Sequence, residues 1–227
     1  MFLMISLAEA QDDPVSLVGV IDFHTHSGPD SRPRSITDLE VTRLFKEAGL
    51  RGMVLKNHFT MTADRAALAM PEVDGLEIFG GLVLNRTVGG LNAEAIRHMV
   101  RWEGGRGKVV WLPTWDAEHN GFRMDADGNV TSPSASDPVI PVVEDGAPVP
   151  ALREIFALIA EHDLVLATGH SSSEEALILI PAAKAQGVRH ILVTHPFGQH
   201  ATMDQMRQMG SEGAIMELDW FAVTRGS

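Results

Sequence analysis

Short apolar runs alternate along this chain with longer segments in which apolar residues recur at helical spacing. Runs bounded by Gly, Pro, Asn or Ser predict strands, and the segments between them predict helices. The predicted strands are 20–26, 52–58, 76–84, 108–114, 164–168, 189–194 and 213–218. The predicted helices are 35–49, 62–70, 92–102, 150–162, 171–186 and 202–209. This alternation indicates an α/β protein with a parallel sheet.

Polar side chains follow the predicted strands at their carboxyl ends. These residues are His24, His26, Lys56, His58, Asn85, Asp116, His170 and His195. In a (β/α)8 barrel the carboxyl ends of the strands converge on one mouth, where active sites are found. We therefore predict an α/β fold of the TIM-type (β/α)8 barrel class. Only seven strands can be identified, so we expect the barrel to be truncated after strand seven, with a long loop insertion after strand four.

The chain is expected to consist of an N-terminal extension, residues 1–19, and one incomplete barrel domain, residues 20–227. Residues 116–149 break the alternation, because they are rich in Gly, Pro, Ser and Asp and show no sustained period. Such a stretch is typical of a lid or insertion near a functional site, and disorder is the alternative. Within it, Asp127-Gly128-Asn129 is typical of a hairpin turn.

Charge and composition exclude several classes of function. The net charge of −12 opposes binding to nucleic acid or to an anionic membrane, because phosphates would be repelled. No cysteine is present, so a metal site would need His, Asp, Glu or a modified Lys. No Gly-x-Gly-x-x-Gly follows the first strand, which leaves dinucleotide binding without support. The first residues lack the basic start of a signal peptide, and we expect a cytoplasmic protein.

The first predicted strand ends in two histidines separated by one residue, His24 and His26. Side chains alternate between the faces of a strand, so both histidines point to one side, about 6–7 Å apart along the strand. That spacing suits two imidazoles that bind one cation. The alternative is a strand end with two histidines that face solvent.

A resemblance rests on the motifs Phe23 to His26, Gly169-His170 and Thr194 to Pro196. These motifs, in this order, resemble the amidohydrolase superfamily of metal-dependent hydrolases. Four more segments resemble a group of bacterial amidohydrolase-related proteins of undetermined substrate, namely 54–58, 80–85, 89–92 and 110–114. The resemblance extends over residues 20–217, nearly the whole chain.

The resemblance implies that His24, His26, His170 and His195 bind one or two divalent metal ions. Zinc is the first expectation, with manganese, iron or nickel as alternatives. The superfamily pattern also implies a carboxylate after strand eight that accepts a proton from metal-bound water. No eighth strand is found, so we expect the chain to be a fragment; otherwise Glu217 or Asp219 would take that role.

Three further residues are candidates at the mouth. Lys56 could be carboxylated and bridge two metals, could bind an anionic substrate group, or could only neutralise nearby carboxylates. His58 shares the strand face of Lys56 and could be a ligand, as a strand-two histidine is in the polymerase-and-histidinol-phosphatase type of barrel. Asp116 begins the insertion and could reach the mouth, with a solvated loop position as the alternative.

We therefore expect a metal-dependent hydrolase of the amidohydrolase type that cleaves a C–N or ester bond in a small molecule. A bound cation would make hydroxide available at neutral pH. Its expected catalytic residues are Lys56, Asp116 and Glu217. The alternatives are a barrel phosphoesterase and a metal-binding barrel without catalysis. We expect no nucleic-acid or membrane partner, and we leave homo-oligomer formation open.

Overall fold

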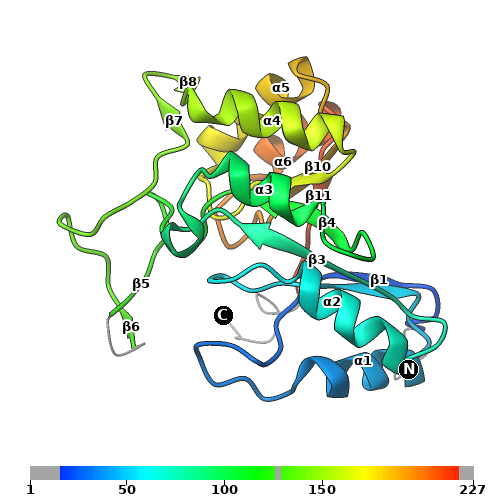
Figure 1. The fold of residues 1–227 in the computed structure, drawn as a ribbon. Helices are drawn as coiled ribbons and strands as arrows, with labels where there is room; N and C mark the ends of the chain where they lie inside the picture. The colour runs from blue at the N-terminus through cyan, green and yellow to red at the C-terminus, as the bar shows by residue number, and fades with distance from the viewer. Residues whose placement is uncertain (1–15, 126–128, 220–227) are drawn as a thin grey trace, which may run out of the picture.

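A seven-stranded parallel sheet forms the framework of the protein (Figure 1). The computed structural model describes residues 16–125 and 129–219. The strands, in their order across the sheet, are β1 (Ile21–Thr25), β2 (Gly52–Leu55), β3 (Glu77–Val83), β4 (Gly107–Trp111), β9 (Val165–Ala167), β10 (His190–Val193) and β11 (Ile215–Met216). Each predicted strand is present, and the parallel α/β arrangement is confirmed.

The prediction of a TIM-type (β/α)8 barrel is wrong. β1 and β11 are the two outer strands of an open sheet, and no strand pairing joins them within the residues placed in the structure. The alternation of strands and helices specifies parallel neighbours along the chain. Closure additionally requires the first and last strands to pair at a suitable tilt and stagger, and no local pattern encodes that. The sheet therefore curls without closing.

Six α-helices follow the predicted segments. They are α1 (Asp38–Glu47), α2 (Ala63–Ala69), α3 (Ala93–Met99), α4 (Ala151–Glu161), α5 (Ser173–Ala185) and α6 (Met203–Ser211), with short 3-10 helices η1 (Met70–Glu72) and η2 (Arg86–Val88). Their starts are fixed by side chains that accept hydrogen bonds from free backbone N–H groups. Asn92 caps α3, and Ser172 forms a capping box with Glu175 at the start of α5. Among the described residues, no helix has the length and apolarity needed to cross a membrane.

The insertion between β4 and α4 contains two short antiparallel hairpins. β5 (Arg123–Met124) pairs with β6 (Val130–Thr131), and β7 (Val143–Glu144) pairs with β8 (Ala147–Pro148). Most of the turn predicted at 127–129 lies outside the described residues, which omit 126–128. The second hairpin turns at Asp145-Gly146, whose φ angles of 49° and 75° are those of a tight two-residue turn. Figure 1 shows the β5–β6 segment extending away from the helices.

The helices cover one face of the sheet, and a second apolar cluster fills the other face. Figure 1 shows α1 and α2 at one end of the sheet and α3 to α6 at the other. Side chains alternate between the two faces. Leu82 and Val110 pack under the helices, whereas Val83, Val109 and Trp111 belong to the cluster on the opposite face. This second cluster forms the floor beneath the carboxyl ends of the strands.

Two adjacent glycines in β3 let a neighbouring loop approach the sheet closely. Thr62, at the start of α2, donates its hydroxyl to Leu55 O at 2.7 Å and accepts from Gly81 N at 2.8 Å. A Cβ on Gly81 would overlap the carbonyl oxygen of Val109 and lie 2.5 Å from Trp111 Cζ3. Only glycine fits at this position. A Cβ on the adjacent Gly80 would overlap the carbonyl oxygen of Thr62, so glycine there lets Thr62 hold the loop that follows β2 against the sheet.

Gly81→Ala should destabilise the protein by about 1–3 kcal/mol or more, because backbone and a buried tryptophan must move to admit the methyl group. Gly210→Ala is the matched control, since Gly210 lies in α6 with nothing within 4 Å of an added Cβ. That change should be neutral or stabilise by about 0.5–1 kcal/mol. Urea unfolding of both variants measures the difference, and equal midpoints would contradict the assigned packing.

Candidate metal centre

Five histidines form a ring at the carboxyl ends of the strands. Successive ring centroids lie 5.1 Å apart for His24–His26, 4.7 Å for His26–His58, 6.2 Å for His58–His170, 5.4 Å for His170–His195 and 4.6 Å for His195–His24. They come from β1 and from the segments after β1, β2, β9 and β10. The structure thus brings together all the histidines that the sequence proposed as ligands, and we call them the histidine ring.

Each imidazole of the histidine ring has an oxygen atom within 3.0 Å of its Nδ1. The pairs are His24 with Glu217 Oε1 (2.6 Å), His26 with Lys56 O (3.0 Å), His58 with Thr114 Oγ1 (2.8 Å), His170 with Asn120 Oδ1 (2.9 Å) and His195 with Asp219 Oδ2 (2.8 Å). Histidines that bind metals usually have one ring nitrogen held by such an acceptor, which leaves the other for the metal. The same nitrogen is hydrogen-bonded in four of the rings, and in His195 it lies at ion-pair distance from Asp219.

Lys56 makes His24 different from the other four. Its Nζ lies 2.9 Å from His24 Nε2, so both nitrogens of this imidazole are engaged. The lysine side chain is only 1% exposed, and its Nζ lies 5.2 Å from the centre of the Trp111 ring. Lys56, His24 and Glu217 therefore form one continuous hydrogen-bonded row. His24 can bind a cation through Nε2 only where Lys56 gives up its contact.

Burial shifts the two charged groups of this row in opposite directions. It lowers the pKa of Lys56 to about 7, although the nearby charges of Glu217 and Asp219 oppose the shift. It raises the pKa of Glu217 to about 7, and here the charge of Lys56 opposes the shift. The second carboxylate oxygen of Glu217, Oε2, is buried and has no hydrogen-bond partner in the part of the chain that the structure describes. It is the free acceptor of the site.

The imidazoles are held in their neutral form. Burial is the largest cause and the positive charge of Lys56 the second, and together they keep the pKa well below its ordinary value for His24, His26, His58 and His170. The same two causes lower the pKa of His195 to about 4, against the opposing charge of Asp219. Neutral imidazole is the form that binds metal ions.

Asn85, which follows β3, positions His58 through hydrogen bonds to its backbone and to Thr114. Its Nδ2 donates to His58 O at 2.9 Å and to Thr114 Oγ1 at 2.8 Å, while its Oδ1 accepts from Thr114 N at 2.8 Å. Thr114 in turn contacts the His58 ring. The sequence places Asn85 among the polar residues at strand ends. The role of Thr114 could not be predicted, because threonine is common in strands and does not by itself indicate a functional site.

His170 is positioned by the insertion and by a glycine. Asn120 is buried, its Oδ1 faces the imidazole, and its Nδ2 donates to Phe122 O. Gly169 adopts a φ of +64°, and a Cβ there would lie 2.5 Å from Pro113 O. The Gly169-His170 motif therefore needs its glycine. Sequence reasoning missed Asn120, which stands in a segment without periodicity.

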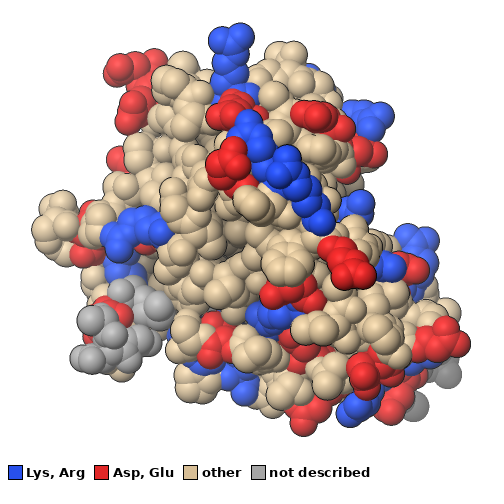
Figure 2. Space-filling model, in the orientation of Figure 1, with Lys and Arg blue, Asp and Glu red and all other residues tan. Residues whose placement is uncertain are grey.

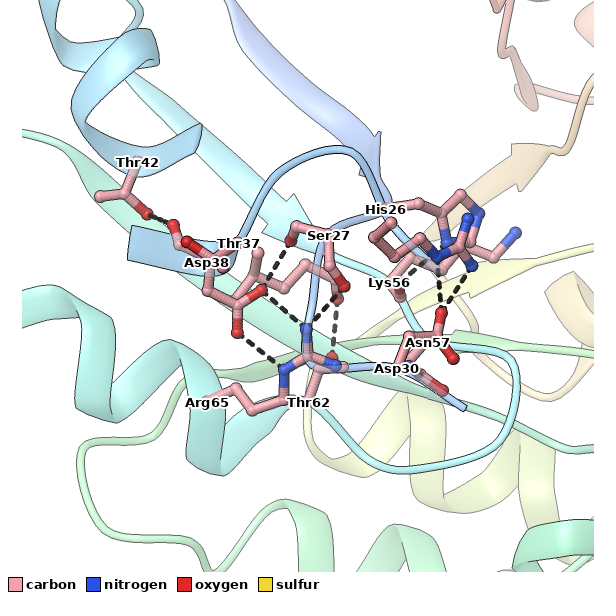
Figure 3. A network of polar contacts seen from close by, with 12 residues as sticks. His26, Ser27, Asp30, Thr37, Asp38, Thr42, Lys56, Asn57, Thr62 and Arg65 are labelled. Atoms are coloured by element: carbon pink, nitrogen blue, oxygen red, sulfur yellow. Dashed lines mark hydrogen bonds and ion pairs between the residues drawn. The ribbon is translucent and has the colours of Figure 1, made fainter. Parts of the chain in front are cut away.

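A buried ion pair fixes the loop that follows His26. Asp38 accepts hydrogen bonds from Ser27 Oγ at 2.6 Å and from Arg65 Nε and Nη2, both at 2.7 Å. Figure 3 shows Ser27, Asp38 and Arg65 converging between α1 and α2, with His26 and Lys56 farther along the same network. The contact joins the loop after β1 to α2, and it thereby orients the His24/His26 pair.

The structure does not place Asp116 in the histidine ring. Its carboxylate accepts from Arg86 N at 2.8 Å and lies 3.8 Å from Arg86 Nε, so it serves the η2 turn. His119 likewise contacts Glu175 of α5, at 3.0 Å. Glu217 and Asp219, by contrast, both reach the ring. Proximity to a strand end was therefore not sufficient for a place in the site.

The donor set fits a divalent transition metal. Imidazole nitrogens together with carboxylate oxygens suit zinc, iron, nickel and manganese. Ligand atoms of His24, His195 and Glu217 all lie within 4.8 Å of one another. The buried, unpartnered Oε2 of Glu217 is the kind of atom that a cation or a water molecule would satisfy.

The fold and the site together define an open parallel α/β protein with a polyhistidine cluster at its strand ends. The chain belongs to a family of unknown function, DUF6282, whose model matches residues 19–217. No curated protein matches the chain. The crystal structure of an uncharacterized protein is similar to it, with a TM-score of 0.49 and 14% sequence identity, over 92% of this chain and 55% of that one. The chain thus spans about half the length of that protein.

Asn120→Ala should weaken zinc binding by about 10–100-fold, because the His170 ring would lose the acceptor that orients it. Asn129→Ala is the control, since Asn129 is an exposed residue of the same insertion. Competition with a coloured zinc chelator measures both affinities. Equal affinities for the two variants would show that the insertion does not support the site.

Proposed function

We propose that this protein is a metal-dependent hydrolase of the amidohydrolase type, which cleaves a C–N or ester bond in a small molecule. One observation supports the proposal above all others: five imidazoles, each with an oxygen within 3.0 Å of Nδ1, form one ring, and two of them, His24 and His195, lie with a buried carboxylate that has a free oxygen. In four of the five rings, His24 being the exception because of Lys56, Nε2 forms no hydrogen bond to a described residue. The open sheet differs from a closed barrel, but the strand ends still present their side chains to one place.

The residues that would hold the metal are His24, His195 and Glu217, whose ligand atoms lie within 4.8 Å of one another, with His26, His58 and His170 on the same histidine ring as further candidate ligands. When bound, one or two divalent ions, zinc first, would lower the pKa of a water ligand from about 15.7 to about 7 and polarise the bond to be cleaved. Manganese, iron and nickel are the alternatives.

Glu217 is proposed to move the proton. Its Oε1 accepts from His24 Nδ1, which leaves Oε2 to take a proton from the attacking water. A pKa raised to about 7 lets this carboxyl group hold the proton and then pass it to the leaving nitrogen or oxygen. Lys56, at the other end of the row, fixes the second nitrogen of His24. Asp219 keeps the His195 ring oriented.

Phosphoester hydrolysis by the same residues is the second candidate. The observation that favours it is the position of His58, whose ring stacks on His26 at 4.7 Å and so adds an imidazole from the second strand. A larger set of imidazoles can bind a second metal ion, and two cations stabilise the negative charge of a phosphate group. Chromogenic phosphate esters, compared with esters and anilides, distinguish the two reactions.

The metal is tested by comparing His170→Ala with His98→Ala. His170 is 5% exposed and belongs to the ring, whereas His98 is an exposed residue of α3. Purified wild-type protein should contain about one or two divalent ions per chain, His170→Ala should lose most of them, and His98→Ala should retain them. Elemental analysis by mass spectrometry gives the metal content, and a chelator should abolish hydrolysis of 4-nitrophenyl esters or 4-nitroanilides.

Two results would contradict this proposal. The first is wild-type protein that carries no transition metal and takes none up when soaked with zinc. The second is hydrolysis that survives complete removal of the metal. Tight metal binding without turnover on esters, anilides or phosphate esters would instead support a metal-binding protein without catalysis.

Lys56→Met should abolish hydrolysis while the fold persists. Methionine has a similar length, and it removes a buried amine whose desolvation is unfavourable, so the free energy of unfolding should stay the same or rise. Lys108→Met is the control, because Lys108 is an exposed residue of β4. Turnover and thermal unfolding are measured on both variants. Unchanged turnover in Lys56→Met would limit this lysine to a structural role.

A further inference from the structure

Arg32 is connected to the histidine ring through Trp115, and it forms no salt bridge with any acidic side chain that the structure describes. It lies in the loop between β1 and α1, and its guanidinium carbon is 4.8 Å from the centre of the Trp115 ring. Trp115 itself lies 5.9 Å from His58, between their ring centres. Stacking on an aromatic face holds a guanidinium in place without using its N–H donors. No hydrogen bond from Arg32 to another described residue is present, so its donors remain available to a ligand.

Arg32 differs from the other unpaired basic side chains of the described residues because it is partly buried and lies outside the Lys56 row. The neighbouring Arg34 is paired with Asp30 at 2.6 Å. Within residues 16–125 and 129–219, the other basic side chains that form no salt bridge are the exposed Lys46, Arg51, Arg101, Lys108 and Arg153, and the buried Lys56 of the site. Figure 2 shows the general pattern, with basic side chains interspersed among acidic ones on the visible face. Arg32 is partly buried, and it still lacks a counter-charge.

Three aromatic rings stand beside Arg32 and the histidines. Trp115 lies 4.7 Å from Phe122 and 6.2 Å from Phe59, and Phe122 lies 6.1 Å from His170, all between ring centres. The indole Nε1 of Trp115 is buried and donates to no acceptor among the described residues, although the side chain is only 6% exposed. We call Phe59, Trp115 and Phe122 the aromatic wall. Phe122 is 38% exposed and Phe59 is partly exposed, so the wall offers an apolar surface close to the Arg32 guanidinium.

We propose that the substrate carries an anionic oxyacid group, a carboxylate or a phosphate, that binds Arg32, next to a flat unsaturated group that packs on the aromatic wall. This inference builds on the proposed hydrolase function and names its substrate class. The guanidinium fork matches two oxygens of such a group, and stacking on Trp115 orients it in advance. The flat group would cover the wall as an aromatic partner does.

The test compares benzoate and phenyl phosphate with the neutral benzamide, by isothermal titration. Arg32→Gln should weaken binding of the two anions by about 10–100-fold and leave benzamide unchanged, because only a charge-assisted contact is lost. Arg51→Gln, an exposed arginine without a salt bridge, is the matched control and should change nothing. Phe122→Ala should weaken benzoate and benzamide alike. The tighter of the two anions identifies the oxyacid.

Each titration is run on metal-loaded and on chelator-treated protein, which separates this inference from the proposed function. Loss of anion binding in Arg32→Gln with the metal removed supports the inference even if no hydrolysis is ever found. Wild-type-like anion binding in Arg32→Gln overturns it, as does benzamide binding that equals benzoate binding in the wild type. Arg32→Lys, which keeps the charge and loses the fork, should fall between the two. Circular dichroism confirms that each variant is folded.

Discussion

The contact between His24 and Glu217 is the constraint on which the site depends. These residues belong to opposite ends of the sheet, 193 positions apart in the chain, and their side chains meet at 2.6 Å. The strands that carry them do not pair, so the curl of an open sheet alone brings them together. The remaining histidines follow the carboxyl ends of β1, β2, β9 and β10. A flatter sheet would contain the same residues and have no common centre.

Much of this arrangement is readable from the sequence, because it is local. The seven parallel strands, the caps at Asn92 and Ser172, and the histidines at strand ends follow from periodicity and from the chemistry of free backbone groups. Barrel closure was predicted wrongly, since pairing of the first and last strands is a property of the whole sheet. The Asp145-Gly146 pair is a turn signal of the same kind, because both residues adopt positive φ angles that aspartate and glycine tolerate.

The parts of the site that escaped prediction are those set by distant contacts. Asn120 and Thr114 are ordinary residues until the fold places them against His170 and His58. Asp116 shows the converse, because a carboxylate at a strand end turned out to hold the Arg86 backbone. A position at the end of a strand identifies residues whose side chains can face the histidine ring. Whether a side chain is needed there depends on partners that lie tens of residues away.

The uniform use of Nδ1 has a consequence for proton stoichiometry. In His24, His26, His170 and His195, Nδ1 faces a carbonyl or carboxylate oxygen. In the folded protein this oxygen favours the tautomer that carries the ring proton on Nδ1. In His26, His170 and His195 the lone pair on Nε2 is then available before any ligand arrives, whereas the Nε2 of His24 contacts Lys56 Nζ. A cation captured at Nε2 would expel no proton from an imidazole. Any proton released to the buffer would have to come from Lys56, from Glu217 or from water. Because the fold selects the tautomer, the groups that exchange protons in the site are different from the imidazole nitrogens that would bind a cation.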